Sequence, residues 1–334
     1  MFGISARIAS VARIILVLAL LPTTRVPTAT ADKTELSWRA DHHMHLSSAD
    51  LCSKLGDCED CQCINSNHPP AVLASDAVKA LDTAHVSKGV ILSCAYLYGL
   101  ASMHLPPGVE QKSIRVENEF TAAEVGKYPT RLIGFLSVDP LQDAAVDELR
   151  YWAKKPTFVG LKLHFRASSV NIRSAGDREK VGRVLREAAK ERIPIVIHVG
   201  GGDFNASDAE QFIREVLPNA GDSWVQLAHA GGGMPKQDGN NLQVLRTFGD
   251  HIVKDDPKTR HLLFDLSYVP APNESAEDSA AVAREIRRIG IKRFLFGSDF
   301  NVLMPTEQIR NLGKLGLTAE ELQTLSQNCA PWAC

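Results

Sequence analysis

The sequence predicts one α/β domain folded as a (β/α)8 TIM barrel, and three observations support this prediction. The 334 residues are 44% hydrophobic and 23% charged, which is ordinary for a soluble globular enzyme. Short apolar runs alternate with amphipathic helical patterns, as expected for a parallel sheet that is buried on both faces. Eight such units in about 300 residues suit this barrel. The apolar runs lie at 38–46, 88–97, 131–138, 158–165, 193–199, 224–230, 261–267 and 293–299.

Residues 1–31 precede the first run and are predicted to be a cleaved signal peptide. They contain three arginines, no acidic residue, an apolar run at 14–21, and the small residues Ala29 and Ala31 before Asp32. A membrane anchor is the less favoured interpretation, because this apolar run is too short to span a bilayer. We therefore expect a barrel domain at 32–334 that is periplasmic or secreted and has no membrane attachment after cleavage.

The first apolar run ends in the motif His43-x-His45. Alternate residues of a strand share a face, so these two imidazoles should point the same way. Two imidazoles at a strand end form half of a divalent-metal site. His42 should face the opposite side, outside the coordination sphere.

A cysteine-rich insertion follows this strand, from 47 to about 75, and its length suggests a lid or rim over the barrel mouth. In an oxidising compartment, clustered cysteines favour disulfides, with a structural zinc knot at 58–63 as the alternative. Cys94, inside the second apolar run, is expected to be a buried thiol. The other cysteines are Cys52, Cys58, Cys61 and Cys63 in the insertion and Cys329 and Cys334 near the end.

The fourth run places Lys162, His164 and Arg166 on one face, since their positions alternate along a strand. Three potentially cationic groups would then line the interior and mouth of the barrel. This arrangement is suited to binding a substrate carboxylate.

The fifth, sixth and eighth runs end at His198, His229 and Asp299, each next to glycines that let the backbone turn close to a ligand. An N-cap role is the alternative for Asp299. Capping boxes at 207–210 and 318–321 place the preceding polar residues on strand-to-helix loops, at the end of a barrel where chemistry occurs. Side chains that can bind a metal therefore recur at the ends of strands 1, 5, 6 and 8, and this recurrence favours one shared site.

With these motifs, the chain resembles the metal-dependent amidohydrolase superfamily, in the branch that includes aminocarboxymuconate-semialdehyde decarboxylase. The resemblance runs from about 39 to 332 and rests on His43-x-His45 and on the segments 160–164, 198–200, 229–232, 297–300 and 328–330. It implies that the metal ligands are His43, His45, His198 and Asp299, and that His229 acts beside the metal-bound water. Binuclear members suggest an alternative with two metals bridged by a carbamylated Lys162. Asn301 departs from the pattern, because the family often has proline there.

Three neutral imidazoles and one carboxylate leave a divalent ion with positive charge and an open position, so that bound water reaches a pKa of roughly 7. We expect one Zn2+, with His229 and Asp299 as the catalytic groups. The expected reaction is hydrolysis, in which metal-bound hydroxide cleaves a C–N or C–O bond of an amide, lactone or ester. The alternative is a nonoxidative decarboxylase of a small carboxylic acid, since the same ligand set serves lyases in this branch. A metal-retaining binding protein without turnover is the third interpretation.

The charge pattern limits the partners. The net charge is -2, and the chain has neither a basic tract suited to nucleic acid nor an amphipathic basic helix suited to a membrane surface. The expected partner is a small-molecule substrate, and the resemblance adds a homodimer as the oligomeric state to test.

Overall fold

The computed structural model describes residues 36–55, 71–103, 105–106, 108–201, 203–232 and 240–334. The described residues belong to one compact unit, Leu36–Cys334. The predicted signal peptide and the insertion cysteines Cys58, Cys61 and Cys63 lie outside them.

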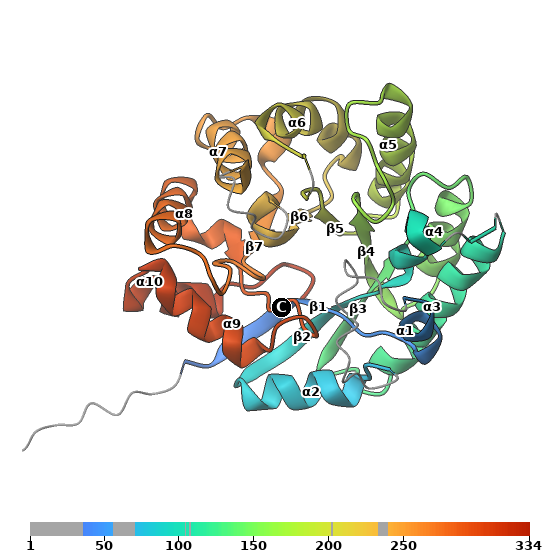
Figure 1. The fold of residues 1–334 in the computed structure, drawn as a ribbon, viewed down its shortest axis with the longest axis horizontal. Helices are drawn as coiled ribbons and strands as arrows, with labels where there is room; N and C mark the ends of the chain where they lie inside the picture. The colour runs from blue at the N-terminus through green and yellow to red at the C-terminus, as the bar shows by residue number, and fades with distance from the viewer. Residues whose placement is uncertain (1–35, 56–70, 104, 107, 202, 233–239) are drawn as a thin grey trace, which may run out of the picture. The chain divides into compact units, whose positions relative to one another are not determined.

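Eight parallel strands form one sheet in sequence order and confirm the predicted TIM barrel (Figure 1). The last and first strands meet through backbone hydrogen bonds, from His42 N to Phe296 O (2.8 Å) and from Asp299 N to His43 O (2.8 Å), which nearly close the barrel. The strands are β1 Trp38–Met44, β2 Val86–Leu92, β3 Leu132–Ser137, β4 Phe158–His164, β5 Ile195–His198, β6 Val225–Leu227, β7 Leu262–Asp265 and β8 Phe294–Leu295.

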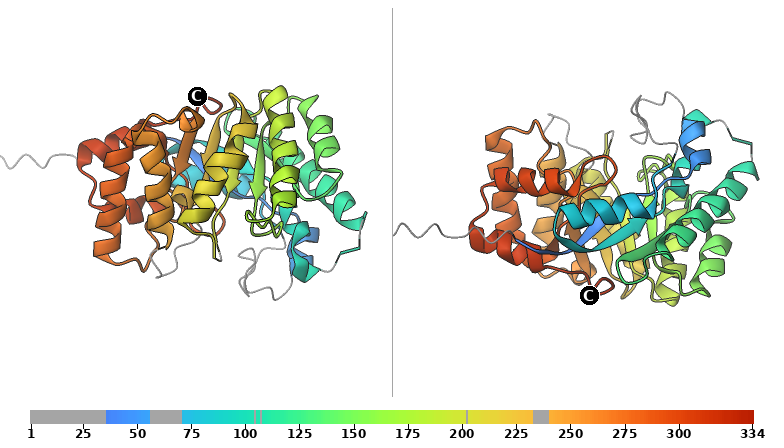
Figure 2. Two further views of the ribbon diagram at one scale, coloured as in Figure 1. Left: turned by 90° about the horizontal axis from the view of Figure 1, so that it is seen from above. Right: turned by 90° about the horizontal axis from the view of Figure 1, so that it is seen from below.

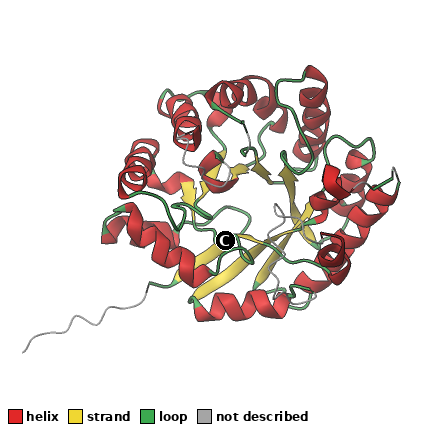
Figure 3. Cartoon of the chain, viewed as in Figure 1, coloured by secondary structure: helices red, strands yellow, loops and turns green. Residues whose placement is uncertain are grey.

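Helices surround the sheet and cover its outer face, as the amphipathic patterns predict (Figures 2 and 3). None of the helices in the described part of the chain is long and apolar enough to cross a membrane. The α-helices there are α1 Ala49–Leu55, α2 Ala74–Thr83, α3 Val109–Val125, α4 Ala145–Ala153, α5 Ala175–Lys190, α6 Ala206–Gln211, α7 Asn240–Val253, α8 Ala276–Ile289, α9 Pro305–Leu312 and α10 Ala319–Gln327.

The predicted strands end early in the structure, most clearly in the second, sixth and eighth runs. The sixth run leaves the sheet after Leu227, where the 3-10 helix η5 Ala228–Gly231 begins. The second run leaves the sheet after Leu92, and a 3-10 helix, η1 Ala95–Gly99, occupies its last part. Side-chain hydroxyls compete with the ladder there, because Ser93 Oγ accepts from Ala95 N and Ser137 Oγ accepts from Tyr96 N. The eighth run leaves the sheet after Leu295 and reaches Asp299 as a loop.

The C-terminal segment closes the amino-terminal end of the barrel. An apolar cluster joins Ala333 and the partly buried Trp332 to residues of the inner strands such as Val90 and Phe135. Lys88, near the start of β2, donates to Ala333 O at 3.1 Å, and a disulfide joins Cys329 to Cys334. Figure 2 shows the C-terminus at the end of the barrel opposite α1. The polar strand ends therefore face the other opening.

Candidate metal centre

His43 and His45 lie at the carboxyl end of β1, and Asp299 lies in the loop after β8. The Nδ1–H of His43 donates to Asp265 Oδ2 at 3.0 Å, and the Nδ1–H of His45 donates to Leu92 O at 2.9 Å. These assignments follow from the partners, since a carboxylate and a carbonyl oxygen only accept. Each imidazole therefore presents an unprotonated Nε2 to the site.

The two Nε2 atoms and one carboxylate oxygen form a small triangle. His43 Nε2 is 3.1 Å from His45 Nε2, and Asp299 Oδ1 is 3.4 Å from the first and 3.3 Å from the second. Three acceptors face one another without a proton between them, and the side chains of His43, His45 and Asp299 are only 1%, 9% and 8% exposed. Metal–ligand distances of about 2.1 Å give ligand–ligand separations of about 3.0 to 3.4 Å in octahedral or tetrahedral sites. The donor set therefore fits a divalent cation.

The protonation states also suit a metal. Burial lowers the pKa of His43 to about 4, although Asp265 opposes this effect. Burial alone would raise the pKa of Asp299, but the nearby imidazoles of His45, His43 and His229 hold it well below its usual range. Near pH 7 His43 is therefore a neutral imidazole and Asp299 an ionised carboxylate, which are the forms that bind metals.

Asp299 and His229 both have left-handed backbone conformations, with φ of 67° and 52°. Residues that carry a side chain adopt this region at a cost of about 1 kcal/mol or more, and such residues cluster at functional sites. The N-cap position of α9 is Met304, so Asp299 does not cap that helix. These observations favour a functional role for Asp299 over the alternative of a cap.

Asp265, at the end of β7, is a residue of the site that sequence analysis missed. Its carboxylate accepts from His43 Nδ1, from Gln226 Nε2 at 2.6 Å and from His229 N at 3.1 Å. A carboxylate that accepts from a ligating histidine fixes the orientation of the ring and raises its basicity. The available signal was a lone acidic residue at the carboxyl end of the apolar run 261–267.

His229 and His198 lie beside this cluster. The Nδ1–H of His229 donates to Ser267 O at 2.9 Å, which leaves its Nε2 available, and its ring centroid is 4.9 Å from that of His43. His198 is 4.7 Å from His229 by the same measure. Among the described residues, the groups whose ligand atoms all lie within 4.8 Å of one another are His43, His45 and Asp299, and His43, His229 and Asp265. His198 belongs to neither group.

The three residues predicted on β4 have different environments. Lys162 is fully buried, and its Nζ has no hydrogen-bond partner within the described residues. His164 stacks between Tyr96 and His198, with ring centroids 4.7 and 4.0 Å away. Arg166 is exposed, and its side chain lies beside Gly201, in the loop after β5. Lys162 is thus inside the barrel, His164 forms part of its wall, and Arg166 lies at the mouth.

His42 does not join the centre. Its Nδ1 donates to Phe296 O at 3.0 Å, and its Nε2 accepts from Ala330 N at 3.1 Å. Both ring nitrogens are therefore occupied, and the ring ties β1 to the C-terminal segment.

Comparison with known proteins adds a family and several structural neighbours. A family profile described as amidohydrolase matches residues 40–327. A search of curated proteins finds no match.

Three solved structures illustrate the similarity. A 2,6-dihydroxybenzoate decarboxylase in complex with 2,6-dihydroxybenzoate has 16% identity and a TM-score of 0.56, over 87% of this chain and 97% of that one. A 5-carboxyvanillate decarboxylase from Novosphingobium aromaticivorans with bound manganese has 11% identity and a TM-score of 0.61, over 89% and 97%. An amidohydrolase from Burkholderia multivorans with bound zinc has 14% identity and a TM-score of 0.57, over 87% and 96%.

The prediction of a hydrolase is contradicted by these neighbours. Most of them with a named reaction are decarboxylases of aromatic acids, which matches the alternative interpretation. The physical reason for the error is that one ligand set serves both reactions, since a bound cation stabilises negative charge whichever bond breaks. The neighbours that bind manganese or zinc, together with the donor triangle, support a divalent metal.

Proposed function

The chain belongs to the amidohydrolase family, and on that premise we propose that it is a metal-dependent, nonoxidative decarboxylase of a small aromatic carboxylic acid. Two observations support the proposal. Structural neighbours with the same fold act on hydroxylated aromatic acids. The site also contains a buried amine that lacks an anionic hydrogen-bond partner within the described residues, and this second observation carries the choice of substrate.

The buried amine is that of Lys162. Burial lowers its pKa to about 8, so the group is still largely an ammonium near pH 7. A buried charge without a hydrogen bond is costly, and a carboxylate is the partner that best relieves this cost. The carboxylate of an acid substrate would supply this partner, whereas a neutral amide or ester would not.

We propose one divalent ion, held by His43, His45 and Asp299 with His198 as a fourth ligand, and zinc as its identity from the nitrogen and carboxylate donors. When bound, the ion supplies positive charge that orients substrate oxygens and stabilises developing negative charge.

The reaction replaces a carboxylate by a proton. The bond between the ring carbon and the carboxylate breaks, its electron pair stays on the ring carbon, this carbon takes one proton, and carbon dioxide leaves. His229 is the proposed proton carrier, because its Nδ1–H is fixed on Ser267 O and its Nε2 remains for the substrate. Tyr96 and His164 form a flat stacked wall against which an aromatic ring can lie.

Export to the periplasm or outside the cell remains part of the proposal and rests on residues 1–31 of the sequence. The homodimer is likewise a proposal, and light scattering on the purified chain measures it directly.

The test is a panel of hydroxylated benzoates incubated with the metal-loaded enzyme in deuterated water. The proposal expects carbon dioxide release and one deuterium at the ring carbon that carried the carboxylate. His229→Asn should abolish incorporation, and Arg284→Gln, an exposed change on α8, should leave it unchanged. Turnover of amides or esters with uptake of solvent oxygen, and no release of carbon dioxide from any acid, would reject it.

A further inference from the structure

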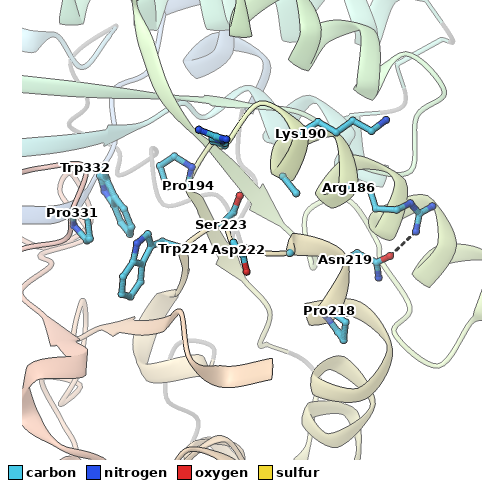
Figure 4. Close-up of a pocket in the computed structure, with 13 residues that line it drawn as sticks. Arg186, Lys190, Pro194, Pro218, Asn219, Asp222, Ser223, Trp224, Pro331 and Trp332 are labelled. Carbon is cyan, nitrogen blue, oxygen red and sulfur yellow. Dashed lines mark hydrogen bonds between the residues drawn. The ribbon is translucent and has the colours of Figure 1, made fainter. Parts of the chain in front are cut away.

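A groove lies at the end of the barrel opposite the metal centre. Figure 4 shows the residues that line it. Its volume is about 890 Å³, which is within the usual range of small-molecule sites. Pro194 and Trp224, which directly precede β5 and β6, line it together with the end of α5 and with Trp332 of the C-terminal segment. The groove is therefore built by the amino-terminal ends of the strands.

One side of the groove is basic. Arg186, Lys190 and Arg192 line it, and Arg186 is held in place by Asn219 Oδ1 at 2.5 Å. The acidic residue of the lining, Asp222, already forms an ion pair with Arg260. Arg186 pairs with Glu179 at 2.6 Å and Lys190 with Glu187 at 3.2 Å, whereas Arg192 has no ion-pair partner in the part of the chain that the structure describes. The guanidinium of Arg192 is therefore the cationic group of the groove that a ligand can pair with.

The other side is aromatic. Figure 4 shows Trp224 and Trp332 next to each other, away from Lys190 and Arg186. The ring of Trp332 makes an edge contact with Phe135, at 6.0 Å between ring centroids. The Cys329–Cys334 disulfide closes the loop that contains Trp332. Rigid indole faces favour planar rings, which stack on them with little loss of conformational entropy.

A buried hydroxyl lies between the two sides. Ser223 is 9% exposed, lines the groove, and has an Oγ without a hydrogen-bond partner within the described residues. A buried polar group in this state is uncommon, and a ligand or water normally satisfies it. In Figure 4 Ser223 lies between Trp224 and Lys190, where a ligand that spans both sides would pass.

We propose that this groove binds a small aryl carboxylate, with its ring against Trp224 and Trp332 and its anionic group on Arg192. The ring matches the indoles, the carboxylate matches the guanidinium, and an oxygen substituent would satisfy Ser223. The site lies at the other end of the barrel from His43 and does not depend on which bond is broken there.

The test is titration of the metal-loaded protein with 2-naphthoate, followed by ligand-detected NMR. Neutral 2-naphthamide and the non-planar cyclohexanecarboxylate are the ligand controls. Arg192→Gln should weaken naphthoate binding about threefold to tenfold, since it removes one partly screened charge. Metal content and thermal midpoint should not change. Lys162→Met, at the metal centre, and Arg284→Gln, on α8, should retain binding.

Three results would overturn the proposal. Equal binding of naphthoate and naphthamide would remove the role of Arg192. Loss of binding in Lys162→Met but not in Arg192→Gln would place the ligand at the metal centre. The third result combines two measurements. If the wild type does not bind naphthoate and Arg192→Gln changes the molecular mass measured by light scattering, the groove is an interface between copies of the chain.

Discussion

Replacing Lys162 with methionine should stabilise the protein and damage its activity at the same time. Lys162 is fully buried, and its pKa is lowered from 10.5 to about 8. At about 1.4 kcal/mol per pKa unit, this difference means that the buried ammonium costs about 3 kcal/mol below pH 8. Methionine has a similar volume and no charge, so it removes this cost.

The buried ammonium also predicts how the stability of the wild type changes with pH. Between pH 8 and 10.5 the unfolded chain holds the lysine proton more tightly than the folded chain, so the wild type should gain stability as the pH rises through this window. Lys162→Met should be more stable than the wild type near pH 7 by up to about 3 kcal/mol and should lack this rise.

Two assays measure these effects. Urea unfolding of the metal-loaded proteins at several pH values gives the stabilities, and steady-state kinetics with the best acid of the panel gives kcat/KM, which should fall about a hundredfold or more through lost carboxylate binding. Arg284→Gln is the charge-removing control on an exposed face. A Lys162→Met protein that is less stable than the wild type at pH 7, or that keeps its kcat/KM, would contradict the role of Lys162 as a costly buried cation that binds the substrate carboxylate.

Three further substitutions test two residues of the site and one buried carboxyl outside it. Asp265→Asn should weaken metal affinity about 10- to 100-fold, measured by competition with a chelator, because His43 loses the carboxylate that orients it; unchanged affinity would contradict this role. His198→Gln should lower the metal content, whereas Tyr96→Leu should not, and equal metal content in both would remove His198 from the ligand set. Glu117 is buried on α3 and accepts from Ser48 N at 3.0 Å. Burial raises the pKa of its carboxyl from 4.5 to about 7, so the wild type should lose stability as the pH rises from 4.5 to 7, and Glu117→Gln should not. Urea unfolding at pH 5 and 8 measures this change, and an equal loss of stability in both proteins would contradict the prediction.

The barrel was predictable because its signal is repeated eight times and each strand is buried on both faces. The ends of the elements were less predictable, since they depend on local competition. The capping box at Thr318 is confirmed, with Glu321 bonded back to its backbone. The capping box predicted to begin at Ser207 begins two residues earlier in the structure. Asn205 is the N-cap of α6, and Asp208 is the residue that bonds back to it. Asparagine and serine are both good caps, and only the folded loop decides between them.

The close approach of His43, His45 and Asp299 was predictable, because polar side chains at the ends of parallel strands meet at one end of a barrel. Asp265 was missed because a single acidic residue in an apolar run has no neighbouring motif, and its partner His43 is 222 positions away in the sequence. The reaction was not predictable from the ligands either. In the proposed function the choice of substrate rests on Lys162, whose burial without a hydrogen bond becomes visible only in the fold.

The most direct test of the metal centre is to count the divalent ions in a preparation that releases carbon dioxide from an aromatic acid. The account predicts about one ion per chain in the wild type, with loss of both the ion and the carbon dioxide release in His43→Ala. A preparation without metal that releases carbon dioxide at the wild-type rate would contradict it.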